Sequence, residues 1–285
     1  MKSGPIGVAG AGAMGSGIAQ VVAQAGKPVL LLDQSPALVE KAIGGLRGGL
    51  AKRVEQGKLD KAAFEATMGN IKAASGIADL RQCALIIEAV FENVDVKKKF
   101  YTELSPAVPA DTLVYSNTST IPITRLGAAV KHPERFGGMH FFNPPQAMRL
   151  VEVIKGLTTA QATIDEGVAF VKAIGKTAIV CGDSPGFAVN RLAVPMLNEA
   201  AFLLGEGIAT KEDIDTGVKL GLNHPMGPFE LMDLLGVEVV YSVICILYEE
   251  TGDSKYRPAP ILRRMVEAGH FGRKTGKGFY EYGRK

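Results

Sequence analysis

A chain of 285 residues is long enough for one large domain or two domains of moderate size. Hydrophobic residues make up 47% and charged residues 21% of the chain, and its 34 glycines are scattered, which excludes disordered and collagen-like classes. The 32 Lys and Arg residues and 29 Asp and Glu residues leave a net charge of +3, too small and too dispersed for a nucleic-acid groove. We therefore expect a soluble globular protein with no nucleic-acid partner.

The sequence shows no sign of a membrane partner or of a metal site. It has no run of ~18 uninterrupted apolar residues and no signal-peptide pattern. The three cysteines, Cys83, Cys181 and Cys245, form an odd set without metal-ligand spacing. Buried free thiols in a reducing compartment are the simplest interpretation, so we expect a cytoplasmic protein.

Short apolar runs alternate with helix-length segments along the first two thirds of the chain. Strands that are buried on both faces read as continuously apolar runs, and such alternation is typical of a parallel sheet covered by helices on both faces. Right-handed crossovers then give a doubly wound α/β domain. The predicted strands are residues 6–9, 29–32, 85–87, 112–115 and 178–180.

A glycine-rich motif follows the first predicted strand and opens a helix. Residues 10–15 read Gly-Ala-Gly-Ala-Met-Gly, and Asp33 ends the next strand, which together form the dinucleotide-binding fingerprint of a Rossmann-type domain. Asp33 would accept hydrogen bonds from ribose hydroxyls, and neighbouring Gln34 offers no cation for a ribose phosphate, so NAD is favoured over NADP. The predicted cofactor contacts of the loop are Gly10, Gly12, Ala13, Met14 and Gly15.

A charge-rich pair of helices is predicted over residues 41–70, followed by further strands. After these strands the alternation of strands and helices ends. Ser184 is a good helix N-cap and Pro185 suits a first helical position, so we place the domain boundary between residues 1–183 and 184–285. Beyond it the sequence shows helical periodicity, including a capped helix start at Thr210, and no convincing strand. We expect an all-helical C-terminal domain.

Two polar residues stand out in apolar surroundings before that boundary. His140 ends one apolar run and Glu152 lies inside another, where a carboxylate is costly unless it is paired. If the two runs lie side by side, Glu152 can hold the imidazole of His140 and fix its tautomer for acid–base work. The spacing alone leaves open a satisfied core histidine and an unrelated glutamate.

Six motifs occur along the chain. They are the glycine loop, Ser-Asn-Thr-Ser at 116–119, His-Phe-Phe-Asn-Pro at 140–144, Leu-Val-Glu-Val at 150–153, Asp-Ser-Pro-Gly-Phe at 183–187 with Asn190 and Arg191, and the tail 272–280. Together they closely resemble the L-3-hydroxyacyl-CoA dehydrogenase family, in particular its short bacterial 3-hydroxybutyryl-CoA members. The resemblance covers essentially the whole chain, in the same order and spacing.

The resemblance implies NAD-dependent interconversion of (S)-3-hydroxyacyl-CoA and 3-oxoacyl-CoA, with 3-hydroxybutyryl-CoA favoured. It makes His140 the general base, Glu152 the residue that orients it, Ser119 a contact of the substrate's 3-oxygen, and Asn190 an amide donor to the substrate. Further cofactor contacts implied by matching positions are Glu92, Lys97, Ser119, Asn143 and Lys274.

The acyl-CoA contacts are less well marked. The family binds the CoA nucleotide near the helix pair after the second strand, which makes Lys52 and Arg53, with Lys58 close by, substrate-binding candidates. Gly48-Gly49 stands where a family serine is expected, so a solvated helix face explains these cations equally well. Departures at 120–122 and 144–147 leave the acyl chain length open.

Three other functions fit parts of the sequence. A 3-hydroxyadipyl-CoA dehydrogenase of aromatic-compound degradation shares every motif. A hydroxy acid dehydrogenase of the related type would use a catalytic lysine, against which His140 and Glu152 argue. A non-catalytic NAD-binding protein could be built on the same fold.

The second domain carries more large apolar residues than one packing layer would cover. Leaving such a surface exposed is unusual for a monomer, and pairing about a twofold axis is the commonest way to cover it. We therefore expect a homodimer joined through this domain, with the active site between the domains of each subunit. The residues are Leu231, Leu234, Leu235, Val239, Val240 and Ile244.

Overall fold

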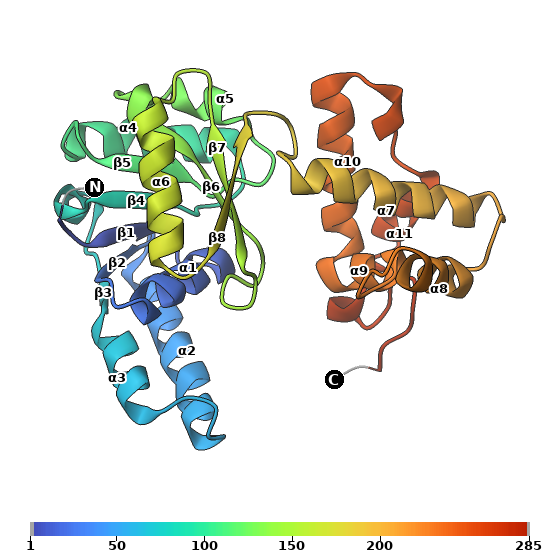
Figure 1. The fold of residues 1–285 in the computed structure, drawn as a ribbon, viewed down its shortest axis with the longest axis horizontal. Coiled ribbons are helices and arrows are strands. Elements are labelled where there is room, and N and C mark those ends of the chain that lie inside the picture. The colour runs from blue at the N-terminus through green and yellow to red at the C-terminus, as the bar shows by residue number, and fades with distance from the viewer. Residues whose placement is uncertain (1–2, 284–285) are drawn as a thin grey trace. The chain divides into compact units, whose positions relative to one another are not determined.

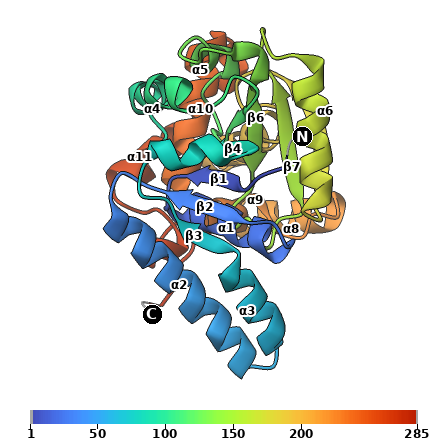
Figure 2. The same cartoon turned by 90° about the vertical axis from the view of Figure 1, so that its left-hand side faces the viewer.

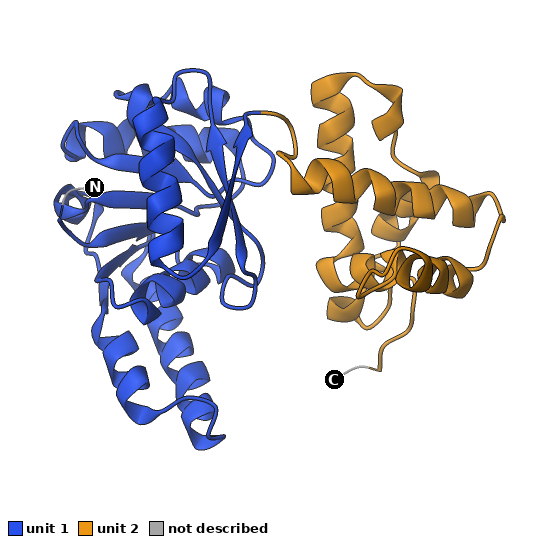
Figure 3. Cartoon of the chain, in the orientation of Figure 1, with its two compact units in different colours: residues 1–183 blue, residues 184–285 orange. Residues whose placement is uncertain are grey.

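The structure, a computed structural model, describes residues 3–283. The chain divides into two compact units, with the division between Asp183 and Ser184 (Figure 3). Each unit has its own hydrophobic core, built only from its own side chains. The units are described one at a time.

Unit 1 is built around one eight-stranded sheet (Figures 1 and 2). Its strand order is β3-β2-β1-β4-β5-β6-β7-β8, so the chain winds outward from β1 in one direction and then outward from β4 in the other. This arrangement confirms the predicted doubly wound domain. The strands are β1 (Ile6–Ala9), β2 (Val29–Leu32), β3 (Ile71–Ala73), β4 (Leu85–Glu88), β5 (Leu113–Ser116), β6 (Phe136–Phe141), β7 (Leu150–Lys155) and β8 (Thr177–Gly182).

Two neighbouring strands, β7 and β8, run opposite to the rest of the predicted parallel sheet. β7 runs antiparallel to β6, whereas every other neighbouring pair is parallel in the part of the chain that the structure describes. Only residues 142–149 connect the two strands, and a parallel crossover needs a dozen residues or more. β6 and β7 therefore form a hairpin.

Helices cover both faces of the sheet. Apolar side chains of α1 and α6, including Ile18 and Phe170, share one core with the sheet, while Tyr101 of α4 packs edge-on against Phe136 of β6. The predicted pair α2 and α3 extends away from the sheet (Figure 2). The α-helices of unit 1 are α1 (Ala13–Gln24), α2 (Pro36–Glu55), α3 (Lys61–Gly69), α4 (Val94–Ala107), α5 (Ile123–Gly127) and α6 (Gln161–Ala173), with 3-10 turns η1 (Ile77–Gln82) and η2 (Pro133–Arg135).

Unit 2 is helical, as predicted. Its core holds Phe229, Met232 and Ile244 at no exposure, and the described residues contain only isolated bridges in place of strands. The expected start at Thr210 is confirmed, since its hydroxyl accepts a hydrogen bond from the Asp213 amide at 3.1 Å. The helices are α7 (Val189–Gly205), α8 (Lys211–Gly221), α9 (Pro228–Leu235), α10 (Val237–Thr251) and α11 (Pro260–Glu267), with 3-10 turns η3 (Ser254–Tyr256) and η4 (Arg273–Thr275).

The first helix of unit 2 begins later than the sequence suggests. Ser184 and Pro185 lie in a turn, and α7 starts only at Val189. Gly186 and Phe187 have φ angles of +73° and +50°, which a right-handed helix does not allow. The expectation of a helix capped by Ser184 was therefore wrong by several residues.

Two residues expected on a dimer surface belong to the core instead. Val240 and Ile244 are 1% and 0% exposed and pack inside unit 2, whereas Leu234, Leu235 and Val239 are exposed. Among the described residues no single helix is long and apolar enough to cross a membrane, although the bent pair α9 and α10 meets the criterion by length and composition.

Candidate active site

Most predicted site residues of unit 1 gather at one edge of the sheet. Because β1, β2, β4, β5 and β6 are parallel, their carboxyl ends lie along the same edge. This edge carries the glycine loop after β1, Asp33 after β2 and His140 near the end of β6. The reversed direction of β7 brings Glu152, near its start, to that edge as well.

The glycine loop has the geometry of a dinucleotide site. Gly10 has a φ of +108°, and a Cβ there would lie 2.3 Å from the Ala89 carbonyl oxygen. A Cβ on Gly12 would meet no atom within 4 Å, so the loop faces open space there. Gly12 is the N-cap of α1 and no side chain caps that helix, which leaves backbone N–H groups for a ligand. The residues present therefore fit NAD.

Asp33 is fixed beside this loop. Its Oδ2 accepts a hydrogen bond from the Ala11 amide at 2.6 Å, and its Oδ1 accepts one from the Gln34 amide at 2.8 Å. A carboxylate oxygen accepts more than one hydrogen bond, so both atoms keep capacity for ribose hydroxyls. This negative charge would repel a phosphate on the same ribose.

His140 and Glu152 are direct neighbours across the β6–β7 hairpin. Their Cα atoms are register partners, and His140 Nδ1 lies 2.7 Å from Glu152 Oε2. They are 4% and 0% exposed, so the interaction is shielded from water. A carboxylate at Nδ1 favours the tautomer that carries its proton on that nitrogen, with Nε2 as the acceptor nitrogen.

The opposite ring nitrogen of His140 faces Ser119. The hydroxyl oxygen of Ser119 lies 3.0 Å from Nε2, in the loop that follows β5. Asn117 ties this loop to β6, because its Oδ1 accepts a hydrogen bond from the Phe141 amide at 2.8 Å. The structure thus brings Ser119, His140 and Glu152 into one line of contacts.

Glu92 and Lys97 lie next to the same loop. Glu92 Oε1 accepts hydrogen bonds from the Thr118 hydroxyl at 2.5 Å and the Ser119 amide at 2.9 Å. Lys97 is only 1% exposed, and its ammonium points inward to Glu88 at 2.5 Å. Their predicted cofactor contacts remain predictions, and Glu92, with a side chain 41% exposed, has the more accessible surface.

Three other predicted residues belong to the hairpin loop and to unit 2. Asn143 is exposed in the hairpin loop, two residues beyond the end of β6. In unit 2, Asn190 is the second residue of α7, and the Lys274 ammonium pairs with Glu238. Their contacts with substrate or cofactor stay predictions.

The cations proposed for CoA lie on the projecting helix pair. Lys52 and Arg53 are exposed in the last turn of α2, and Lys58 is exposed just beyond it. Positive side chains at a helix carboxyl end are also favoured by the helix dipole. Both interpretations from the sequence therefore remain open.

Three residues of the site escaped the sequence analysis. Glu88 is a fully buried carboxylate at the end of β4, and Asn117 positions the serine loop. Lys176 donates to the carbonyls of Pro145 and Met148 at 2.7 and 2.6 Å, which holds the hairpin loop. Burial lowers the pKa of Lys176 below its usual range. Only Glu88 carried a visible signal, a carboxylate ending an apolar run.

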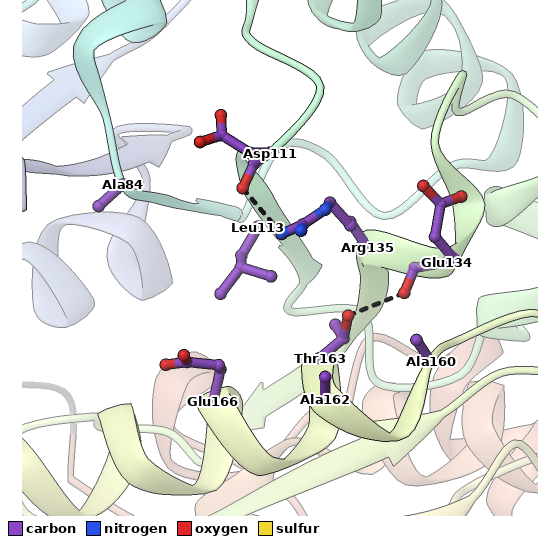
Figure 4. Close-up of a pocket in the computed structure, with 9 residues that line it drawn as sticks. All are labelled: Ala84, Asp111, Leu113, Glu134, Arg135, Ala160, Ala162, Thr163 and Glu166. Carbon is purple, nitrogen blue, oxygen red and sulfur yellow. Dashed lines mark hydrogen bonds between the residues drawn. The ribbon is translucent and has the colours of Figure 1, made fainter. Parts of the chain in front are cut away.

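A separate cavity of about 340 Å³ lies away from this line (Figure 4). It is bordered by Ala84 and Leu113, at the amino-terminal ends of β4 and β5, and so at the opposite edge of the sheet. The Arg135 guanidinium on its wall donates to the Asp111 carbonyl at 3.0 Å. Ser119, His140 and Glu152 do not border this cavity.

Comparison with known proteins identifies the family. Residues 5–184 match the family model described as the NAD binding domain of 3-hydroxyacyl-CoA dehydrogenase, and residues 186–282 match that of its C-terminal domain. The chain belongs to the 3-hydroxyacyl-CoA dehydrogenase family. The predicted family, NAD cofactor and enzyme class are confirmed.

Named relatives cover nearly the whole chain of this family member. A 3-hydroxybutyryl-CoA dehydrogenase of Bradyrhizobium diazoefficiens is 45% identical over 277 residues, which are 97% of this chain and 94% of the relative. The human mitochondrial hydroxyacyl-coenzyme A dehydrogenase is 41% identical, over 96% of this chain and 90% of its own. The crystal structure of (S)-3-hydroxybutyryl-CoA dehydrogenase PaaH1 from Ralstonia eutropha superimposes with a TM-score of 0.95, at 43% identity, and covers 99% of this chain and 100% of that chain.

Proposed function

We propose that this family member interconverts short-chain (S)-3-hydroxyacyl-CoA and 3-oxoacyl-CoA, with 3-hydroxybutyryl-CoA and acetoacetyl-CoA as its preferred pair. The line from Glu152 through His140 to Ser119 is the observation that carries the proposal. A named relative at 45% identity that acts on 3-hydroxybutyryl-CoA supports the short acyl chain.

In the oxidation direction, His140 Nε2 accepts the proton of the substrate's 3-hydroxyl group as the C3–H bond breaks. NAD supplies the hydride acceptor of the reaction. The Ser119 hydroxyl, 3.0 Å from Nε2, donates a hydrogen bond to the same substrate oxygen and holds it within reach of the imidazole. In reduction the imidazolium returns the proton to that oxygen.

Glu152 orients the imidazole of His140 for this work. Its Oε2, 2.7 Å from Nδ1, keeps one proton on that nitrogen and stabilises the imidazolium that forms. A buried carboxylate supplies this stabilisation through a low-dielectric environment, where it is stronger than at the surface. His140 therefore takes up and returns one proton at Nε2 while the hydrogen bond between Nδ1 and Glu152 is kept.

The remaining assignments complete the proposal. Residues 10–15 and Asp33 bind the adenosine half of NAD, and Asn143 contacts its nicotinamide side. Glu92, Lys97 and Lys274 are further cofactor contacts. Asn190 donates its amide to the acyl-CoA, and Lys52 and Arg53 bind the phosphates of CoA. The enzyme is cytoplasmic and works as a homodimer.

The test is NADH oxidation with acetoacetyl-CoA beside longer and carboxylated 3-oxoacyl-CoA substrates. We expect acetoacetyl-CoA to give the highest kcat/KM. A preference for the carboxylated substrate would reassign the enzyme to 3-hydroxyadipyl-CoA, and no NADH oxidation with any of them would overturn the proposed activity.

A further inference from the structure

A buried carboxylate at the end of β4 collects four donors. Glu88 Oε1 accepts from the Lys97 ammonium at 2.5 Å and from the Val90 amide at 2.8 Å. Its Oε2 accepts from the Tyr101 hydroxyl at 2.5 Å and the Ser116 hydroxyl at 2.7 Å. Burial and this carboxylate raise the pKa of Tyr101 well above its usual range, so the phenol stays a donor. Glu88 is thereby held rigidly.

Lys97 connects this carboxylate to a second one. Its ammonium lies 2.5 Å from Glu88 Oε1, 3.3 Å from the Val90 carbonyl oxygen and 3.2 Å from Glu92 Oε2. The contacts with Glu88 and Val90 are hydrogen bonds, and the contact with Glu92 is an ion pair. The position of the Lys97 head group is therefore set by protein contacts.

Glu92 passes this constraint to the loop that carries Ser119. While Oε2 faces Lys97, Oε1 accepts hydrogen bonds from the Thr118 hydroxyl and the Ser119 amide. The Thr118 hydroxyl in turn accepts from the Ile121 amide at 2.9 Å, which closes the turn. One carboxylate thus joins a buried cation to the backbone of Ser119.

We propose that Lys97 is a positioning residue, which holds Glu92 in the orientation that fixes the Ser119 hydroxyl beside His140. This inference rests on the proposed function of Ser119 and His140. It adds a role for Lys97 that a contact with the cofactor would not require.

The charges explain why a cation is needed at this position. Glu88 and Glu92 both approach the same point, and without Lys97 their negative charges would repel each other. Glu88 is fully buried and bound by three other donors, whereas the Glu92 side chain is 41% exposed. Glu92 would therefore turn toward solvent and release the Ser119 loop.

The test compares Lys97→Met in two backgrounds. Because Lys97→Met alone would leave Glu88 buried without a counter-charge, Glu88→Gln is the common background that keeps the fold. In this background Glu88 no longer repels Glu92, so Lys97→Met tests only the attraction between the Lys97 ammonium and Glu92. We expect it to lower kcat about 10- to 100-fold, the usual cost of a small misplacement at a reacting centre. The KM for acetoacetyl-CoA should change by about twofold or less, whereas any rise in the Kd for NADH measures the separate cofactor contact of Lys97. Lys99→Met, an exposed change on the same helix, is the control and should leave kcat unchanged.

The second background adds Ser119→Ala. If Lys97 acts through Ser119, Lys97→Met should have almost no further effect on kcat once the hydroxyl is gone. Equal losses in both backgrounds, unchanged kcat in the first, or a loss confined to NADH affinity would each overturn the inference. Full activity of Ser119→Ala by itself would overturn the proposed function too, which separates the two failures.

Discussion

Each proton acceptor and each hydrogen bond of the catalytic line can be removed by a single substitution. We expect His140→Gln to lower turnover by roughly 10²–10⁴, the usual contribution of a positioned general base, while NADH affinity stays near wild type. His132→Gln is the matched control, because His132 is half-exposed just before η2 and pairs only loosely with Glu134 at 3.5 Å. Wild-type kcat for His140→Gln in a steady-state assay would refute its role.

Glu152→Gln tests the orienting carboxylate separately. The amide keeps the size of the side chain but loses the charge that stabilises the imidazolium, so kcat should fall by roughly 10²-fold or more. Thermal unfolding should change far less, since the fold around the hairpin is preserved. A kcat equal to wild type would show that Glu152 is only a structural neighbour of His140.

Cofactor choice depends on another single carboxylate. Asp33 stands beside the glycine loop, so we expect strong preference for NADH over NADPH in kcat/KM. Asp33→Ala combined with Gln34→Arg should narrow that preference, because repulsion is removed and a phosphate partner is added. Equal use of both cofactors by the wild type would contradict our interpretation of this pocket.

Residue-level prediction succeeded where a polar side chain interrupts an apolar strand. Glu152 stood out for this reason, and in the structure its carboxylate lies 2.7 Å from the His140 imidazole. Glu88 showed the same pattern at the end of β4, but its partner Tyr101 lies thirteen residues away on a helix, a contact that no periodicity reveals. Lys97 looked like one member of a solvated lysine run, and only the fold shows it buried.

At the scale of single elements, α2 contains several glycines, which are poor helix formers, in its interior. Gly45 and Gly49 lie in its exposed interior, and a Cβ on either would meet no atom within 4 Å. Alanine at each position should stabilise the fold by roughly 0.5–1 kcal/mol, because glycine loses more backbone entropy in a helix. Thermal unfolding measures the gain.

A third glycine beside α2 gives the control. Gly57 has equally open surroundings but a φ of +67°, so Gly57→Ala should lower the melting temperature. If all three substitutions shift it in the same direction, backbone conformation does not decide their effect.

Elements with local signals were predictable, and those decided by tertiary pairing were not. The apolar runs of β1, β2, β4 and β5 and the Thr210 cap appear where the sequence places them. The direction of β7 follows from a connection too short for a crossover, which composition does not show. β3 is three residues long with one buried residue, so no apolar run marks it.

For the whole molecule, the homodimer remains a prediction, and fewer of the residues expected on its interface are exposed. Leu234, Leu235 and Val239 stay exposed on unit 2, at 45–49% of their surface, while Val240 and Ile244 do not. Light scattering should give about twice the chain mass of 30.1 kDa. Leu234→Asp should shift the mass toward the monomer, whereas Leu157→Asp on unit 1 should not. A fully active wild-type monomer would refute the prediction.

The β6–β7 hairpin makes the chain unequally tolerant of inserted residues. Side chains alternate between the faces of a strand, so adding one residue inside β6 ahead of His140 would turn the imidazole to the opposite face from Glu152. An equal insertion at the tip of the 142–149 loop would leave the pairing intact. Insertions and deletions among related sequences should therefore occur at the tip of this loop and be absent from β6 and β7. The two strands should keep their lengths together, because the His140–Glu152 pair depends on both.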